Sequence, residues 1–406
     1  MPTATKSSTT ASSTKRSTRG GNAFAFVIPD TRPVMNNDLA RAWLASLICR
    51  QPSAWPAALA DSGELILAVA AEQGVTGLAH ERLATIDVDC PETIRLGFAK
   101  AAKDVSAISL LQQSEARRIL AKLAEAQLPV LLLKGSALAH WLYASATVRE
   151  CSDIDLLFAT RAEAEKAVVV LRGMGYARRE LHLPGDLICF EITCVLESGV
   201  FPGLEVDVHW KLSSSPIYAF RFANEELRAH SQPIARLAAS ACGLSAVHAY
   251  LHACIHRALN ISSGLHDNLK SLYDIHLLGQ LFSAGDWAEL VAEATTRGLA
   301  GTCLDGINAA SAAFHHVAPA HVTQTLAQSE VSELMDVSRM GDWLYLQRMS
   351  FLAFPTWVDR LRWFRQRVVP DWNYLVEYYG QDKGPMAMLA KRIAGGWRRL
   401  LQRSTR

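Results

Sequence analysis

The sequence predicts an α+β fold in which a small mixed sheet is embedded between N-terminal and C-terminal helical segments. Apolar residues recur at helical spacing on both sides of residues 126–215. Within 126–215, short apolar or alternating runs end at turn residues, which is typical of strands. Half of the 406 residues are hydrophobic, which is enough apolar material for a large core and excludes disorder over the whole chain.

The N-terminal segment, residues 36–125, is predicted to be helical. Asp38 is placed to cap a helix that runs through Cys49, and a second helix over 64–73 ends at Gly74. Pro91 is expected to open a long third helix. Residues 1–25 are rich in Ser, Thr, Lys and Arg and are predicted to form a disordered basic tail.

Residues 126–215 are predicted to form the α/β core, with strands over 128–133, 152–158, 187–196 and 204–212. One helix is expected to follow Ser136 to about residue 143, and a second to cover 161–172 before two glycines stop it. The helical pattern then returns. It predicts a helical domain over 216–345 and a C-terminal helical extension over 346–406.

Charge is distributed unevenly along a chain whose net charge is +2. Residues 30–390 hold 31 basic and 39 acidic residues, whereas residues 391–406 hold six basic and none acidic. The acidic body argues against an extended nucleic-acid partner. The C-terminal apolar and basic stripe is predicted to be a solvated tail, with a membrane surface as the alternative; it comprises Ile393, Trp397, Leu400 and Leu401 beside Arg398, Arg399 and Arg403.

Eight cysteines lie apart from one another, without a C-x-x-C pair. We interpret them as buried free thiols in a reducing compartment, which predicts a cytoplasmic protein. No apolar run approaches the length of a membrane span, so no transmembrane segment is expected. The N-terminus has some features of a transit peptide, but it has no amphipathic stripe, and a disordered tail is the favoured interpretation.

Asp153 and Asp155 lie two residues apart on a predicted strand (SDIDLLF, 152–158). Residues i and i+2 of a strand point to the same face, so the two carboxylates repel unless a cation lies between them. Hard oxygen ligands of this kind suit Mg²⁺ or Mn²⁺. Taken alone, the same pair on an exposed strand is usually a solvated face.

A later strand offers a third carboxylate. Glu205, Asp207 and His209 share one face of Leu204–Trp210, and the apolar residues share the other. If this strand lies beside the first, Asp207 joins the aspartate pair, and three carboxylates can hold two metal ions for phosphoryl displacement. His209 would then assist proton transfer or act as a partner that positions Asp207.

Lys134, Gly135 and Ser136 lie between a predicted strand and a predicted helix. Glycine lets backbone N–H groups approach a phosphate, a helix N-terminus attracts anions, and the Ser136 hydroxyl can donate a hydrogen bond. The glycine spacing of a Walker loop is absent. By itself, Gly-Ser after a strand is usually only a turn.

The order of these features resembles the polymerase-β-like nucleotidyltransferase superfamily, and within it the bacterial uncharacterised nucleotidyltransferases. The matching stretches are LLLKGSALAHWLY (131–143), Arg149, SDIDLLF (152–158), Gly175-Tyr176 and VDVHW (206–210). Likeness extends to LILAVAAEQGVTGLAHERL (65–83), HAYLHACIHRALN (248–260) and LKSLYDI (269–275), so it covers most of residues 60–280.

The resemblance implies that Gly135 and Ser136 bind the triphosphate and that Asp153 and Asp155 bind both metals. Asp207 would ligate the catalytic metal and help activate the acceptor hydroxyl. Sixteen residues separate Ser136 from Asp153, longer than the usual interval, and Lys134 offers an alternative phosphate ligand. The resemblance also places Lys270 and Asp274 near the site, with Lys270 reaching a phosphate.

Arg149 and the histidines have two interpretations each. Arg149 would either neutralise a γ-phosphate or orient an aspartate, or else form a salt bridge that holds its loop. His248, His252 and His256 share one helical face, and two histidines at that spacing can bind zinc. Because no Cys or acid completes a zinc site, we predict a packed or hydrogen-bonded stripe that faces the nucleotide cleft.

The sequence therefore predicts an enzyme that moves an NMP from an NTP, with ATP the first choice, to an unidentified hydroxyl-bearing acceptor, releasing pyrophosphate with two Mg²⁺ or Mn²⁺ ions. A D-x-D glycosyltransferase would explain Asp153 and Asp155 but neither the Gly-Ser turn nor Asp207. A non-catalytic nucleotide- or partner-binding module has no need of three carboxylates. Half of a toxin–antitoxin pair would usually be a shorter chain.

Overall fold

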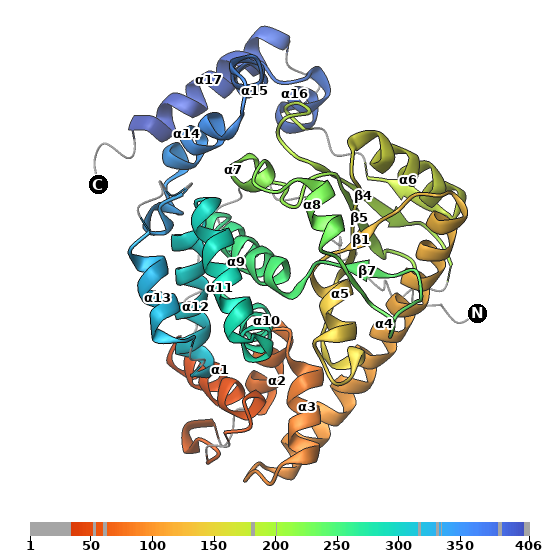
Figure 1. The fold of residues 1–406 in the computed structure, drawn as a ribbon, viewed down its shortest axis with the longest axis vertical. Helices are drawn as coiled ribbons and strands as arrows, with labels where there is room; N and C mark the ends of the chain where they lie inside the picture. The colour runs from red at the N-terminus through yellow and green to blue at the C-terminus, as the bar shows by residue number, and fades with distance from the viewer. Residues whose placement is uncertain are drawn as a thin grey trace, which may run out of the picture. The chain divides into compact units, whose positions relative to one another are not determined.

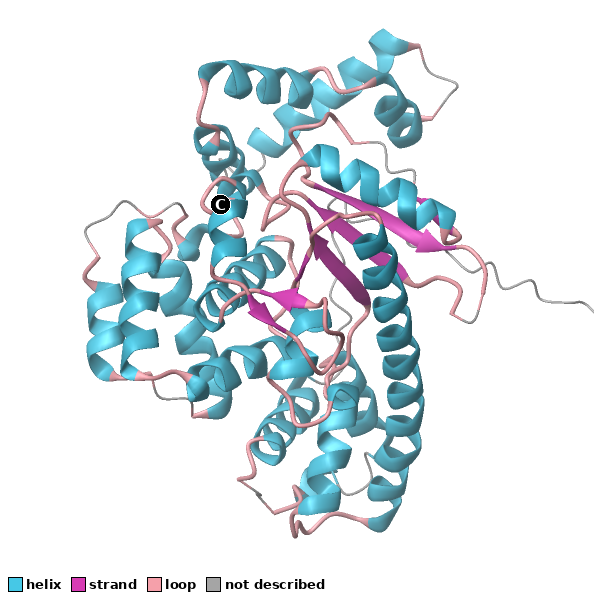
Figure 2. Cartoon of the chain, turned by 45° about the vertical axis from the view of Figure 1, so that its right-hand side comes forward, coloured by secondary structure: helices cyan, strands magenta, loops and turns pink. Residues whose placement is uncertain are grey.

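The computed structural model describes nine stretches of the chain: residues 34–51, 54–59, 63–179, 183–199, 201–315, 318–329, 333, 335–380 and 384–401. The predicted tail over residues 1–25 lies outside the described residues. The α+β fold class is confirmed, because a seven-stranded mixed sheet lies among helices that precede and follow it in the chain (Figures 1 and 2).

Among the described residues, four α-helices precede the sheet: α1 (Val34–Ile48), α2 (Gly63–Glu72), α3 (Thr76–Thr85) and α4 (Glu92–Glu125). As predicted, α2 ends just before Gly74, whose φ of 67° suits glycine, and α4 follows Pro91. The prediction that Asp38 caps the first helix is wrong, because α1 begins four residues earlier. No helix breaker lies between Val34 and Asp38, and Pro33 precedes them.

The strand order in the sheet is β3-β4-β5-β2-β1-β7-β6. The strands are β1 (Leu131–Leu132), β2 (Asp153–Leu157), β3 (Tyr176–Arg178), β4 (Glu191–Leu196), β5 (Glu205–His209), β6 (Gln232–Pro233) and β7 (Cys242–Gly243). The four predicted strands correspond to β1, β2, β4 and β5, each shorter than predicted. The other three strands have two or three residues each, too few to show a periodicity.

The register of β2 against β5 decides which residues meet. The two strands are parallel, with Asp155 paired to Asp207 and Leu157 paired to His209. On the opposite face their apolar residues pack with α4 and with α6 (Arg161–Gly173). The sheet therefore has one apolar face covered by two helices and one face that presents carboxylates.

The carboxylate face lies toward α5 (Lys134–Trp141), α9 (Ala246–Ser262) and α10 (Leu269–Leu281). The α9 helix shares a core with α10, α11 (Ala284–Thr296) and α12 (Ala300–Phe314). The first turns of α10 also pack with α1, α2 and α3 through Leu269, Leu272 and Tyr273. In this way α10 connects the N-terminal helices to the helices that line the carboxylate face.

The remaining elements are α7 (Pro216–Ala219), α8 (Asn224–Ala229), α13 (Ala320–Ala327), α14 (Trp343–Ala353), α15 (Trp357–Val368), α16 (Trp372–Tyr379), α17 (Pro385–Leu401) and the short 3₁₀ helices η1 (Ala57–Leu59), η2 (Ala146–Val148) and η3 (Val337–Arg339). None of the described helices combines the length and apolar character needed to cross a bilayer. The eight cysteines are free thiols, three of them buried and five half-buried.

Asn224 holds the ends of β2 and β5 together. Its amide nitrogen lies 3.1 Å from the carbonyl oxygen of Phe158, 2.6 Å from that of Ala159 and 3.1 Å from that of Trp210. The residue is buried, so water cannot replace these bonds without entering the fold. A side chain from α8 thus fixes the strand pair that carries the aspartates.

We expect the Asn224→Ala substitution to lower the free energy of unfolding by about 2–3 kcal/mol, because it leaves buried carbonyl groups without a donor. Urea denaturation measures the change. The matched control is Asn308→Ala, at an exposed position of α12, which should change stability little. Equal effects of the two substitutions would contradict a role of Asn224 in joining the strands.

Candidate active site

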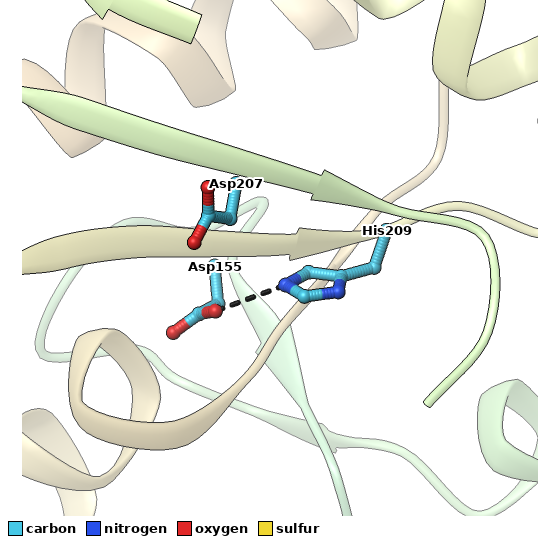
Figure 3. Close-up of side chains that lie close together, drawn as sticks. All are labelled: Asp155, Asp207 and His209. Atoms are coloured by element: carbon cyan, nitrogen blue, oxygen red, sulfur yellow. Dashed lines mark hydrogen bonds and ion pairs between the residues drawn. The ribbon is translucent and has the colours of Figure 1, made fainter. Parts of the chain in front are cut away.

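Three aspartates lie together on one face of the sheet. Asp155 and Asp207 are directly paired across β2 and β5, and Asp153 is two residues before Asp155 on the same face. Figure 3 shows Asp155 and Asp207 on neighbouring strands, with the imidazole of His209 next to Asp155. The structure thus brings together the three carboxylates that the sequence singled out.

Asp155 is surrounded by groups that stabilise its charge. Its Oδ1 atom lies 2.6 Å from the Lys134 ammonium and 3.0 Å from Nε2 of His209. Burial alone would raise the pKa of Asp155, but Lys134 and the hydrogen bond from His209 outweigh burial and hold it well below its usual value. The other oxygen, Oδ2, is buried and has no hydrogen-bond partner among the described residues.

The pKa values of Asp207 and Asp153 are raised, in contrast to that of Asp155. Burial, followed by the charges of Glu191 and Asp155, raises the pKa of Asp207 to about 6, although Thr193 donates a hydrogen bond of 2.6 Å to its Oδ1. Burial and the charge of Asp155 raise the pKa of Asp153. Four carboxylates thus gather around Lys134 and His209, so negative charge is in excess.

The donor set fits a divalent cation. The three aspartates offer hard oxygen atoms on one face, and Asp155, Asp207 and His209 place ligand atoms within 4.8 Å of one another. Oδ2 of Asp155 has no hydrogen-bond partner among the described residues, and the pKa values of Asp153 and Asp207 are raised. A cation bound here would contact this oxygen atom and lower both pKa values. The carboxylates therefore suit Mg²⁺ or Mn²⁺.

A cavity of about 150 Å³ lies beside the aspartates. Groups from three helices and from β2 line it, among them Lys134, Gly135, Asp153, His252, His256 and Lys270. Lys270 has no ion-pair partner among the described residues, and burial, followed by the charge of Arg149, lowers the pKa of its ammonium. The cavity is thus lined by the Asp153 carboxylate and by the Lys134 and Lys270 ammonium groups.

The histidine stripe on α9 divides into two parts. His252 and His256 line the cavity, as predicted, and burial followed by the charge of Lys134 lowers both pKa values, that of His256 to about 3. They are therefore neutral imidazoles. His248 lies elsewhere: its Nδ1 is 3.1 Å from the Ser245 hydroxyl.

Arg149 forms a buried ion pair with a residue 125 positions later. Its Nε lies 3.0 Å from Oδ1 of Asp274, and its Nη2 lies 2.5 Å from Oδ2. The Tyr143 hydroxyl donates to the same carboxylate over 2.7 Å. Of the two interpretations that the sequence left open, this geometry favours the ion pair that holds the loop, although Arg149 also lines the cavity.

Gly135 lines the cavity, whereas the Ser136 side chain is used within the turn. A Cβ atom at Gly135 would collide with the Arg149 guanidinium and with Sγ of Cys151. The Ser136 hydroxyl donates to the Leu133 carbonyl oxygen over 2.8 Å. Lys134, just before them, has a φ of 46°, which is unusual for a residue with a side chain and directs it toward Asp155. Phosphate binding by Gly135 and Ser136 stays a prediction.

Sequence reasoning missed two residues of the site, Glu191 and Thr193 on β4. Their alternation with Ile192 indicates a shared strand face, but only the pairing of β4 with β5 brings that face beside Asp207. His209 was expected either to assist proton transfer or to position Asp207. Its Nε2 lies 3.0 Å from Asp155 and its Nδ1 3.2 Å from Glu191, and its part in proton transfer stays a prediction.

A second group of possible metal ligands, Glu226, His248 and Glu293, lies outside this site. The Arg297 guanidinium contacts both glutamates and offsets part of their negative charge. We assign this group to the packing of α8, α9 and α11.

A family model described as "Uncharacterised nucleotidyltransferase" matches residues 61–315. The chain belongs to this family. The matched segment contains every residue of the aspartate site and of the cavity. Comparisons with curated proteins and with solved structures gave no match. Membership of the family assigns a nucleotidyl transfer function and an NTP substrate to the chain.

We expect Asp274→Asn to lower the free energy of unfolding by about 3–5 kcal/mol, because it leaves the buried Arg149 guanidinium without its counter-charge. Urea denaturation measures the loss, and a double-mutant cycle with Arg149→Met should show strong coupling. The control is Glu125→Gln, which breaks the exposed Lys122–Glu125 pair. Additive effects of the two buried substitutions would contradict the structural role of the pair.

Asp207→Asn should stabilise the metal-free protein at neutral pH. The raised pKa means that folding favours the protonated carboxyl group, so this group costs stability above pH 6 and the cost disappears as the pH falls toward 4. We expect a gain of about 1–3 kcal/mol at pH 7.5 that vanishes near pH 4, measured by urea denaturation in a chelator. A loss of stability at pH 7.5 would contradict the electrostatic picture.

Proposed function

We propose that this chain transfers an NMP from an NTP, with ATP the first choice, to a hydroxyl-bearing acceptor and releases pyrophosphate. The observation that carries the proposal is the pairing of Asp155 with Asp207 next to Asp153, which lines a cavity together with Lys270. The carboxylates suit a metal-bound phosphate, and the Lys270 ammonium in the cavity suits the leaving pyrophosphate. Family membership supports the same reaction class.

Asp153, Asp155 and Asp207 would hold the divalent ions, with two Mg²⁺ or Mn²⁺ expected. When bound, such ions neutralise charge on the phosphate oxygens and on the leaving group. Lys134 and His209 keep Asp155 ionised and in position through their contacts with Oδ1. Thr193 holds the Asp207 carboxylate through its Oδ1 atom.

In the reaction, the acceptor oxygen forms a bond to the α-phosphorus while the bond between that phosphorus and the β-phosphate bridging oxygen breaks. The hydroxyl proton passes to the Asp207 carboxylate, which acts as the general base. Lys270 attracts the departing pyrophosphate. Most of the acceleration comes from positioning and from preorganised charge. We place the reaction in the cytoplasm, in keeping with eight free thiols.

We expect Asp153→Asn and Asp207→Asn each to reduce transfer by about a thousandfold or more, because each removes charge at the reacting phosphate. The assay incubates the full chain with each NTP labelled at the α-phosphate, with Mg²⁺ or Mn²⁺ and cell lysate, and follows label on protein or metabolite. The control is Asp104→Asn, which removes an exposed carboxylate of α4.

Metal-dependent label that both site variants lose and the control keeps would support the proposal and name the base. If no label is transferred, a titration of NTP binding in the same samples shows whether the protein binds the nucleotide. Binding without label in any lysate would indicate a nucleotide-binding module. Absence of NTP binding would overturn the proposal.

A further inference from the structure

The outer face of α15 carries a stripe of exposed apolar side chains. Trp357 is 67% exposed, Leu361 62% and Phe364 55%, and Val368 follows one turn later. Spacings of four, three and four residues place these side chains on one side of the helix. We call these four residues the α15 stripe. Such a continuous exposed stripe is unusual on a protein surface unless something covers it.

The opposite face of α15 anchors the helix. Trp363 is buried against Phe354, and Gln366 donates a hydrogen bond of 2.6 Å to Asp186 in the loop before β4. The Leu187 backbone N–H donates to the same glutamine side chain. Because these contacts hold the inner face, the α15 stripe is directed away from the body of the protein.

Arginines flank the α15 stripe on both sides. At about 100° per residue, Arg360 falls on one side of it and Arg365 falls on the other. Arg362 and Arg367 belong to the inner side of the helix, where Arg362 pairs with Asp186 and Arg367 lies over the Trp363 ring. The Arg360 guanidinium also lies 5.0 Å from the centre of the Trp357 ring. Long arginine stems can lie along an apolar surface while their charged ends reach an anionic layer above it.

The surrounding chain has the same character. Residues 356–406 contain eleven basic and four acidic residues, in contrast to the acidic excess of residues 30–355. Met386 and Ile393 of α17 are exposed as well, and Arg392 of that helix donates to the carbonyl oxygen of Arg367. Side chains of residues 396–401, which include most of the apolar stripe predicted from the sequence, lie outside the described residues.

We propose that the α15 stripe and its flanking arginines bind the surface of a phospholipid bilayer rich in anionic headgroups. Apolar side chains that include Trp and Phe, bordered by arginines, are what an interfacial helix presents to the boundary between headgroups and acyl chains. A second copy of the chain fits less well, because a symmetric contact would bring arginines against arginines. The proposal is independent of the reaction proposed above.

The test is flotation of the full chain with phosphatidylcholine vesicles, with and without about one quarter phosphatidylglycerol. The wild-type chain should bind the anionic vesicles, and added salt should weaken binding. Leu361→Glu should weaken it about tenfold or more, because it puts a negative charge at the centre of the apolar stripe. The matched control is Leu96→Glu on α4, where the leucine is 61% exposed and lies outside this surface.

Thermal denaturation of both variants checks that they fold, which their exposed positions favour. The proposal is overturned if the wild-type chain fails to bind, binds neutral and anionic vesicles equally, or loses as much binding through Leu96→Glu as through Leu361→Glu. Undiminished binding of the Leu361→Glu variant would place the lipid contact elsewhere, for example at the basic N-terminus. A dimer in light scattering that only Leu361→Glu dissociates would assign the stripe to a second copy instead.

Discussion

Asp155 and Asp207 are held side by side by the parallel register of β2 and β5, and like charges this close repel strongly when one of them is buried. The site around them is organised to oppose that repulsion. Lys134 adopts an unusual backbone conformation next to β1 and meets Asp155, while His209 and Thr193 supply hydrogen bonds from β5 and β4. The compensation is incomplete, since the pKa of Asp207 stays raised and one oxygen of Asp155 has no partner in the described structure. An incompletely neutralised set of carboxylates could hold a divalent cation.

Lys134 and Lys270, which both line the cavity, are connected through packed groups. Gly135 follows Lys134 and leaves room for the Arg149 guanidinium, which pairs with Asp274 on α10. Lys270 lies one turn before Asp274 on the same helix, so the ion pair that engages Arg149 also fixes the helix that presents Lys270. A buried ion pair contributes little net stability in general, but it specifies one arrangement of the groups around it. Here it fixes α10, which carries Lys270, relative to the turn that carries Lys134.

The sequence predicts those parts of the site that depend only on the alternation of side chains along one strand. The i, i+2 spacing of Asp153 and Asp155 and the alternation over 204–210 gave their shared faces before any contact was known. The sequence alone could not show that β2 pairs with β5, because register depends on non-local packing. The partner of Arg149 lies 125 residues away, and nothing near Arg149 indicates it. Glu191 and Thr193 became visible only once β4 was placed beside β5, and β6 and β7 are too short for any pattern.

The C-terminal helix α15 has an exposed apolar face that packing within the protein does not explain. Residues 61–315 match the family and contain the whole site, whereas α15 lies beyond them and has two faces of unlike character. Trp363 and Gln366 on its inner face satisfy packing and hydrogen bonds within the protein. Burial of an apolar side chain stabilises a protein by about 1.5–3 kcal/mol. The fold does not gain this free energy from Trp357, Leu361 and Phe364, which stay exposed to water. Since the inner contacts already hold the helix, folding alone does not account for an apolar outer face, and a surface outside the protein is the simplest physical reason for it.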